Sequence, residues 1–428
     1  MKKVLVYSHD AYGLGNIRRM LEITSHLVAS DPEIHVLLIS GSPMLHAFRI
    51  PERVDYIKLP CIGRSEKGET VVKSLGISPE DTIRMRANII MMAALDFQPD
   101  VVLVDKKPFG LQDELHLALT MLGQRKKRAK TVLLLRDILD APEVTRAQWE
   151  KSGYHEAIRA HYDRVAIVGT EEVFDAVNQY GFPEATAGRV NYCGYIKRPL
   201  PARTREEVRA ELGFGSEPMV LVTAGGGADG YAMMKAYLQG LADSPQDPGF
   251  RTLLISGPEM SPVQREEIFG LAARCPGVTV REFTSDMIGC MNASDLVISM
   301  GGYNTVCELL TLRKKAIIVP RVRPVQEQWI RAARMQEMGL LRALHPDALT
   351  PESLIAAVRE ELGRENVRSH ALYNFAMDGL PQIAEVIRQL LPAQPQVKVP
   401  AAARQARIAS PAFGAATPRL PLSMAARG

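Results

Sequence analysis

The chain has 428 residues, of which 46% are hydrophobic and 23% charged, a composition typical of globular proteins and long enough for two domains of ordinary size. Its formal charge of +4 lies at the C-terminal end, because residues 392–428 hold five basic and no acidic residues, and the subtraction 4 − 5 leaves residues 1–391 at −1. A body with this balance lacks the basic excess of nucleic-acid-binding proteins, so we predict no nucleic-acid partner.

The five cysteines are scattered and form neither a CxxC pair nor a metal-ligand spacing, so we predict reduced thiols and no metal site. The N-terminus runs directly into a strand pattern and its apolar run is too short for a signal peptide. No stretch approaches the 18 apolar residues of a membrane-spanning helix. We therefore predict a cytoplasmic protein without a transmembrane segment.

The first half of the chain alternates short apolar runs with helical patterns, an order typical of an open parallel sheet. The stretch 61–78 is rich in charge and glycine without a clear period, which predicts a mobile loop. Polar residues follow several strands, where ligands of such sheets bind. Strands are predicted at 4–7, 35–40, 54–59, 101–104, 131–135 and 164–168, and helices from the first glycine loop to about 29 and over 79–97.

A second series of strands, glycine turns and helices follows an interdomain linker at about 191–201. The fold class is therefore α/β, with two Rossmann-like doubly wound parallel-sheet domains that face a cleft. We place the domains at 1–198 and 199–370, a closing helix at 371–391 and a disordered, basic Ala/Pro-rich tail at 392–428. Strands are predicted at 219–223, 251–256, 278–281, 296–299 and 316–319, and helices at 205–212, 231–241, 350–362 and 378–391.

Two glycine-rich turns of the second half follow predicted strands and are candidates for one anion site. The backbone amides of such a turn and the positive end of the following helix attract negative charge, so the two turns together could hold a diphosphate. Neither turn is a full GxGxxG fingerprint and no GxxxxGK[ST] occurs, which disfavours NAD and a P-loop nucleotide. The glycines are Gly225, Gly226, Gly227, Gly301 and Gly302.

Polar residues beyond the last two strands could complete the site. Asn304 or Thr305 is predicted to stand at the start of a helix, and Glu308 lies one turn later, where a carboxylate can reach a ribose diol. After strand 316–319 come Arg323, which could screen phosphate charge, and the pair Glu327 and Gln328, which could bind sugar hydroxyls. The alternatives are an ordinary βα turn with a solvated glutamate and a solvated helix start.

These residues resemble the nucleotide-sugar glycosyltransferases of the GT-B fold, most closely the family 28 type exemplified by the peptidoglycan N-acetylglucosaminyltransferase. The run from Gly301 to Glu308 matches the donor motif of that family, whose glutamate binds the ribose. The turn 225–227 is similar to its second glycine loop, and residues 13–19 to its N-terminal loop, which faces the acceptor. The pair 327–328 stands where a Gln-Gln pair contacts the donor sugar.

The resemblance implies transfer of a sugar, an N-acetylhexosamine or a hexose, from a UDP-sugar to an acceptor hydroxyl with inversion, and without a metal or another cofactor. It assigns the acceptor to residues 1–198 and the nucleotide sugar to residues 199–370. The acceptor can be a glycan, a glycolipid or a small molecule. Peripheral contact at the inner face of a membrane is compatible with such an enzyme, although no strongly basic amphipathic helix stands out.

The chain departs from the family pattern where the acceptor is expected. Asn16 replaces a histidine that is a candidate base, and an amide cannot take a proton from a hydroxyl. His9 and Asp10 therefore become the catalytic candidates, with Asp137 behind them, and Glu327 in place of Gln leaves the donor sugar open. The acceptor-side residues are Gly13, Gly15, Asn16, Arg18 and Asp137.

Two other functions fit the same pattern. The UDP-N-acetylglucosamine 2-epimerases share the architecture but require several carboxylates and a histidine at the sugar, and no clear set is evident. A catalytically silent nucleotide-sugar-binding scaffold is the second alternative, and Asn16 is the residue that supports it.

Overall fold

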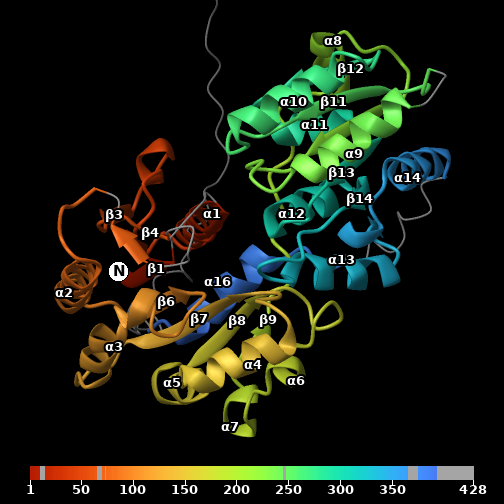
Figure 1. The fold of residues 1–428 in the computed structure, drawn as a ribbon. Helices are drawn as coiled ribbons and strands as arrows, with labels where there is room; N and C mark the ends of the chain where they lie inside the picture. Colours follow the sequence, from red (N-terminus) through yellow and green to blue (C-terminus); the bar gives the residue numbers. More distant parts are fainter. Residues whose placement is uncertain (10–14, 65–69, 73, 244–246, 365–374, 393–428) are drawn as a thin grey trace, which may run out of the picture. The chain divides into compact units, whose positions relative to one another are not determined.

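The computed structural model describes residues 1–9, 15–64, 70–72, 74–243, 247–364 and 375–392. This part of the chain forms two parallel sheets, each with helices on its faces, and a small hairpin (Figure 1). Most central strands are buried along their whole length, because helices cover both faces of each sheet. The predicted α/β fold with two doubly wound parallel sheets is confirmed.

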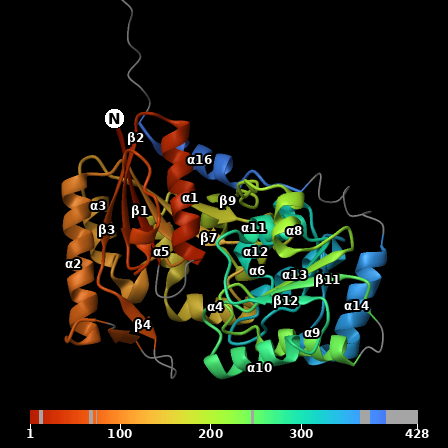
Figure 2. The same cartoon turned by 90° about the horizontal axis from the view of Figure 1, so that it is seen from above.

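The first sheet has the strand order β3-β2-β1-β6-β7-β8-β9 and every neighbouring pair is parallel. The chain therefore winds outward in both directions from the neighbouring strands β1 and β6. Figure 2 shows β1 and β3 of this sheet between α1 and α2. Its strands are β1 (Lys2–Ser8), β2 (Ile34–Ser40), β3 (Val54–Lys58), β6 (Val101–Asp105), β7 (Lys130–Arg136), β8 (Arg164–Val168) and β9 (Val190–Tyr192). Its helices are α1 (Gly15–Ser30), α2 (Pro79–Phe97), α3 (His116–Gly123), α4 (Pro142–Lys151), α5 (Tyr154–His161), α6 (Ala176–Tyr180) and α7 (Glu184–Ala187), with short 3-10 turns at Leu45–Ala47 and Leu111–Asp113.

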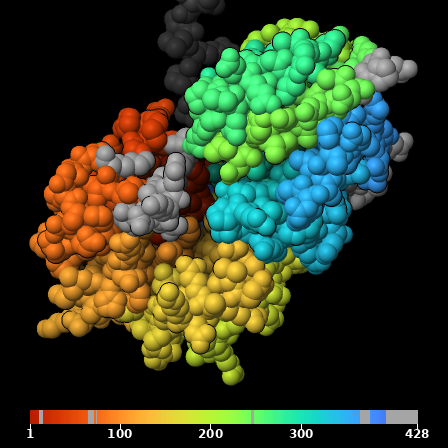
Figure 3. Space-filling view, in the orientation of Figure 1, coloured from red at the N-terminus to blue at the C-terminus, as the bar shows by residue number. Residues whose placement is uncertain are grey.

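The second sheet has the order β12-β11-β10-β13-β14-β15 and is also parallel throughout. Helix α14 packs against α9, and Figure 3 shows these two segments in blue and green side by side on the surface. The strands are β10 (Met219–Thr223), β11 (Arg251–Ile255), β12 (Val278–Arg281), β13 (Leu296–Ser299), β14 (Lys315–Ile318) and β15 (Arg342–Ala343). The helices are α8 (Arg205–Leu212), α9 (Tyr231–Ala242), α10 (Pro262–Ala272), α11 (Met287–Ala293), α12 (Tyr303–Leu312), α13 (Glu327–Glu337) and α14 (Pro351–Gly363), with a 3-10 turn at Pro346–Ala348.

The last helix, α16 (Gly379–Leu390), packs on α1 and β8 of the first sheet. Its start is joined to the chain that follows β9, because the Tyr195 N–H donates to the carbonyl of Ala376 at 2.9 Å and the Gly379 N–H donates to the carbonyl of Tyr195 at 3.0 Å. A closing helix was predicted over 371–391. The first four of those residues lie outside the described part of the chain, as does the predicted tail beyond residue 392.

Two sequence predictions need correction. The stretch 61–78, predicted as a loop, contains the antiparallel hairpin β4 (Ile62–Arg64) and β5 (Thr70–Val72), whose three-residue strands are too short to show a period. The predicted linker at 191–201 begins inside β9, and its Tyr195 is fully buried in the core. The domain boundary after residue 198 stays a prediction. None of the described helices is both long and apolar enough to cross a membrane.

Candidate active site

The two predicted glycine turns lie side by side at the carboxyl edge of the second sheet. Strands β10 and β13 are neighbours, and their last residues, Thr223 and Ser299, pair in register. The chain leaves β10 toward β11 on one side and leaves β13 toward β14 on the other. Such a reversal of strand order opens a crevice between the two connections, which is where ligands of doubly wound sheets bind.

The turn after β13 requires a glycine and ends in an open helix start. Gly301 has φ +73°, and a Cβ built on it would lie 2.5 Å from Cγ2 of Ile318, so a larger residue is strained there. Gly302 is the N-cap of α12 and no side chain caps the helix. The Val306 N–H makes the first bond of the helix, to the carbonyl of Gly302 at 2.9 Å. The amides before Val306 therefore have no intrahelical acceptor and can bind an anion.

The turn after β10 is held close to the loop that follows β11. The carbonyl of Gly226 accepts a hydrogen bond from the Glu259 N–H at 2.7 Å, and a Cβ on Gly227, which has φ +99°, would collide with the carbonyl of Ser256. Gly225 also has a positive φ, +66°. The glycines here thus allow a close approach of two backbones, which holds this turn against the loop after β11.

Glu308 lies one turn into α12 and is 93% buried, with a relative exposure of 7%. Burial raises the pKa of its carboxyl, although the nearby Arg18 and Arg198 act in the opposite direction. The Nη2 atom of Arg18, on α1, lies 3.7 Å from Oε1 of Glu308. The predicted ribose-binding carboxylate therefore faces a cation from the first sheet's opening helix.

Asn304 joins the start of α12 to the start of α1. Its Oδ1 accepts a hydrogen bond from Nη2 of Arg198 at 2.6 Å, and its Nδ2 donates to the carbonyl of Gly15 at 3.4 Å. Arg198 also forms an ion pair with Glu22 of α1. The predicted donor turn and part of the predicted acceptor loop thus lie against each other, with Thr305 beside them in the first turn of α12.

The described part of the acceptor loop is tied to the first sheet. The Nδ2 of Asn16 donates to the carbonyl of His9 at 2.7 Å, and the His9 N–H donates to Oδ2 of Asp105 at 3.3 Å. The His9 side chain is buried beside Tyr7, with the two rings edge to face at 6.5 Å. Asp10 and Gly13 lie outside the described residues, so the structure locates only His9 of the two catalytic candidates.

Asp137, which follows β7, is held in a buried ion pair with Arg331 of α13. Nε and Nη2 of Arg331 lie 2.5 and 2.9 Å from the two carboxylate oxygens, and the Tyr195 hydroxyl donates to Oδ2 at 2.7 Å. Nη1 of Arg331 donates to the carbonyl of Gly301 at 3.1 Å. Asp137 is therefore occupied as an ion-pair partner, an arrangement that disfavours proton abstraction from an acceptor.

Arg331 is the main functional candidate that the sequence did not single out for this role. It is fully buried and fixes the peptide that joins Gly301 to Gly302. Because a trans peptide places its N–H opposite its carbonyl, the Gly302 N–H points away from Arg331. No local pattern could reveal the contact with Asp137, since the two residues are 194 positions apart.

Glu327, predicted at the donor sugar, is buried among arginines. Nη1 of Arg136 lies 3.3 Å from its Oε2, and Nη2 of Arg331 lies 3.2 Å from the same oxygen. Burial alone would raise its pKa, but these arginines bring the pKa of Glu327 below the usual value, so it is a carboxylate at neutral pH. The nearby Lys106 is partly buried, and this desolvation lowers its pKa to about 8.

Gln328 and Arg323, the other two residues predicted beyond strand β14, differ in their surroundings. Oε1 of Gln328 accepts a hydrogen bond from the Arg321 N–H at 2.9 Å, which anchors it to the chain before α13. Arg321 itself pairs with Asp229, at 3.0 Å, next to the glycine turn after β10. Arg323 is exposed and remains able to meet a ligand.

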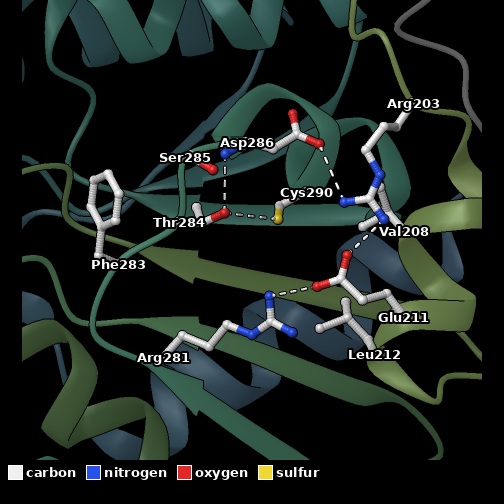
Figure 4. Close-up of a pocket in the computed structure, with 10 residues that line it drawn as sticks. All are labelled: Arg203, Val208, Glu211, Leu212, Arg281, Phe283, Thr284, Ser285, Asp286 and Cys290. Atoms are coloured by element: carbon white, nitrogen blue, oxygen red, sulfur yellow. Dashed lines mark hydrogen bonds and ion pairs between the residues drawn. The ribbon is translucent and has the colours of Figure 1, made fainter.

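A pocket of about 370 Å³ lies between α8, the chain that follows β12, and α11 (Figure 4). Its charged side chains pair with one another: Arg281 and Arg203 each contact Glu211, at 3.0 and 2.6 Å, and Arg203 also lies 3.7 Å from Asp286. The sequence did not predict this pocket. Among the residues that the structure describes, no group of three or more His, Cys, Asp or Glu side chains could hold a metal ion.

Comparison with known proteins gives a family match for the part of the chain that forms the second sheet. Residues 220–385 match the family model described as the glycosyltransferase family 28 C-terminal domain. This part of the chain is similar to family 28 C-terminal domains. It includes both glycine turns and α12, so the resemblance predicted from the run Gly301 to Glu308 is confirmed.

The relatives agree with this assignment. The chain is 27% identical over 225 residues to a UDP-N-acetylglucosamine–N-acetylmuramyl-(pentapeptide) pyrophosphoryl-undecaprenol N-acetylglucosamine transferase of Methylorubrum populi. That alignment covers 52% of this chain, and the chain spans only 59% of the relative's length.

Solved structures show the fold. MurG of Acinetobacter baumannii has a TM-score of 0.59 at 17% identity, over 91% of this chain and all of its own. A UDP-GlcNAc 2-epimerase of Neisseria meningitidis, bound to UDP-GlcNAc, has a TM-score of 0.58 at 13% identity, over 91% of this chain and 99% of its own. The predicted GT-B fold is thus confirmed, and a fold shared by both proteins does not by itself select a reaction.

Proposed function

We propose that the protein is a glycosyltransferase that transfers a sugar from a UDP-sugar to an acceptor hydroxyl. The observation that carries the proposal is the open start of α12 at the point where the strand order reverses, with the Glu308 carboxylate one turn into the helix. The amides of such a helix start favour phosphate, and a carboxylate at that distance suits the hydroxyls of a ribose. The family 28 match and the named transferase relatives support this choice.

The proposed reaction is a single displacement that inverts the anomeric carbon. The acceptor oxygen forms a bond to that carbon as the bond to the diphosphate oxygen breaks, and the electron pair leaves with UDP. The amides of α12 and of the turn 225–227, together with nearby arginines, stabilise the charge on the leaving diphosphate, so the reaction needs no metal. The acceptor proton goes to a base, for which His9 and Asp10 remain the candidates.

The donor sugar is proposed to be an N-acetylhexosamine or a hexose, as the family resemblance implies, and Glu327 in place of the expected glutamine leaves the choice between them open. Glu327 is already paired with Arg136 and Arg331, so its free oxygen lone pairs can accept hydrogen bonds from sugar hydroxyls without a new buried charge. The acceptor remains a glycan, a glycolipid or a small molecule. A cytoplasmic location with peripheral membrane contact is part of the same proposal.

The test is UDP release from a panel of UDP-sugars with and without acceptors, in the presence and absence of EDTA. We expect acceptor-dependent release that EDTA leaves unchanged, and a loss of donor affinity in Glu308→Gln. The matched control is Glu337→Gln, since Glu337 is an exposed helical glutamate that pairs with Arg334. Interconversion of the sugar without an acceptor, as in an epimerase, contradicts the proposal. Tight UDP binding with no turnover of any donor also contradicts it and favours a silent scaffold.

A further inference from the structure

Arg18 and Glu308 occupy matching positions on two helices that begin at the same place. The carbonyl of Gly15, the first residue of α1, accepts a hydrogen bond from Asn304 in the first turn of α12. Arg18 lies one turn further along α1, and Glu308 lies one turn further along α12. Side chains three and four positions apart share a helix face, so the ion pair follows from the way the two helix starts meet.

Three other arginines around this junction are buried and pair with nearby side chains. Arg19 donates to Asp105 at 2.7 Å, Arg198 pairs with Glu22 and Asn304, and Arg331 holds Asp137. Each of their side chains is at most 2% exposed. Removing any of these cations from its partner would leave a buried charge uncompensated, which is costly. These three arginines are therefore fixed parts of the structure.

Arg18 differs from them in exposure and in the length of its contact. Its side chain is 45% exposed, and within the described residues its ion-pair partner is Glu308, at 3.7 Å. A charge-assisted hydrogen bond between a guanidinium and a carboxylate is normally about 2.7–2.9 Å long, so this pair is a loose electrostatic contact. Arg18 is therefore held less firmly in its ion pair than the other three arginines.

A nucleoside diphosphate would compete for both members of this pair. Ribose hydroxyls would donate to the Glu308 carboxylate, and the diphosphate, in front of the α12 amides, would bring several negative charges beside the exposed guanidinium. Phosphate oxygens match the planar fork of arginine and attract it more strongly than a carboxylate that is already engaged.

We propose that Arg18 moves from Glu308 to the diphosphate when the donor binds, and so supplies a cation from α1 to the leaving group held by α12. Without a donor, the same arginine compensates the negative charge of the buried Glu308 carboxylate. The inference rests on the proposed function, because it takes the diphosphate of the donor as its ligand. It makes Arg18 a residue that touches the substrate, and it couples donor binding to the contact between α1 and α12.

The test compares the affinities of uridine, UMP and UDP for wild type, Arg18→Ala and Arg18→Lys, by calorimetry and, for weak ligands, by ligand-observed NMR. We expect Arg18→Ala to weaken UDP about ten- to a hundredfold, the value of a hydrogen bond to a charged group, and to leave uridine within about twofold. Arg18→Lys should keep part of the UDP affinity, because a point charge remains. The difference between wild type and Arg18→Ala should shrink as salt is added.

The matched control is Arg388→Ala. Arg388 is 46% exposed, lies on α16 and has an ion pair with Glu385, so its removal should change neither affinity. If Arg18→Ala leaves UDP affinity unchanged, or weakens uridine and UDP by the same factor, the proposed role of Arg18 is wrong while UDP binding stands. A wild-type protein that binds neither uridine nor UDP contradicts the proposed function, and with it this role.

Discussion

The buried pair of Asp137 and Arg331 predicts a large loss of stability on substitution of Asp137 by Asn. Asp137 accepts hydrogen bonds at 2.5 and 2.9 Å from Arg331 and at 2.7 Å from Tyr195, and both members of the ion pair are at most 1% exposed. Neutralising the carboxylate leaves the buried positive charge of the Arg331 guanidinium with less compensation. Breaking a buried pair in this way costs about 3–5 kcal/mol, which is more than a hundredfold in the folding equilibrium constant.

The assay is urea denaturation followed by circular dichroism, with two companion variants. Glu337→Gln breaks the exposed pair with Arg334, 2.7 Å apart, and should cost less than about 1 kcal/mol. The double variant Asp137→Leu/Arg331→Met replaces the pair by apolar side chains but also removes the contacts of Arg331 with Glu327 and with the Gly301 carbonyl, so it should recover only part of the lost stability. If Asp137→Asn is no more destabilising than Glu337→Gln, the pair does not stabilise the junction of β7, α13 and the Gly301 turn.

Further predictions concern the glycine turn and two groups with shifted pKa. Gly301→Ala should lower the melting temperature and the affinity for UDP, since φ is +73° and the new Cβ would lie 2.5 Å from Ile318. In the control Gly302→Ala the new Cβ meets no atom within 4 Å, so the melting temperature should not fall. Equal melting temperatures of the two variants would refute this reasoning. Uridine affinity, measured by NMR, should fall as pH drops through the raised pKa of Glu308, because protonation removes the acceptor, and Glu308→Gln should abolish this dependence. The free energy of unfolding, measured in urea, should rise from about pH 8 to 10.5, because Lys106 loses its proton near pH 8 in the folded protein and keeps it up to pH 10.5 in the unfolded chain. Lys106→Met should reduce this rise, and an unchanged pH profile in that variant would contradict the prediction.

Much of the fold follows from local patterns. Helix α2 was predicted with both ends correct, because Pro79 suits a first turn and a periodic pattern runs to Phe97; the structure adds that Ser78 caps the helix by accepting from the Asp81 N–H at 3.0 Å. Strand β8 was likewise predicted exactly as Arg164–Val168. The hairpin β4–β5 was missed, since its three-residue strands are set by pairing with each other rather than by a period of their own.

The candidate site, too, could be predicted only as far as local sequence patterns reach. The glycine turns and the place of Glu308 one turn into α12 could be inferred from two short runs of sequence, 225–227 and 301–308. The partners of those residues could not, because Asn304 with Arg198, Glu308 with Arg18, and Asp137 with Arg331 are contacts between distant segments. Such contacts depend on how the helix starts meet in the folded chain, and residue spacing carries no signal of that.

The most direct test of the account is a crystal structure of the protein with UDP. We predict the diphosphate oxygens at the amides of Gly302 to Thr305, the ribose hydroxyls within hydrogen-bond distance of the Glu308 carboxylate, and the Arg18 guanidinium turned from Glu308 to the diphosphate. UDP bound away from the start of α12, or bound there with its ribose out of reach of Glu308, would contradict the central claim.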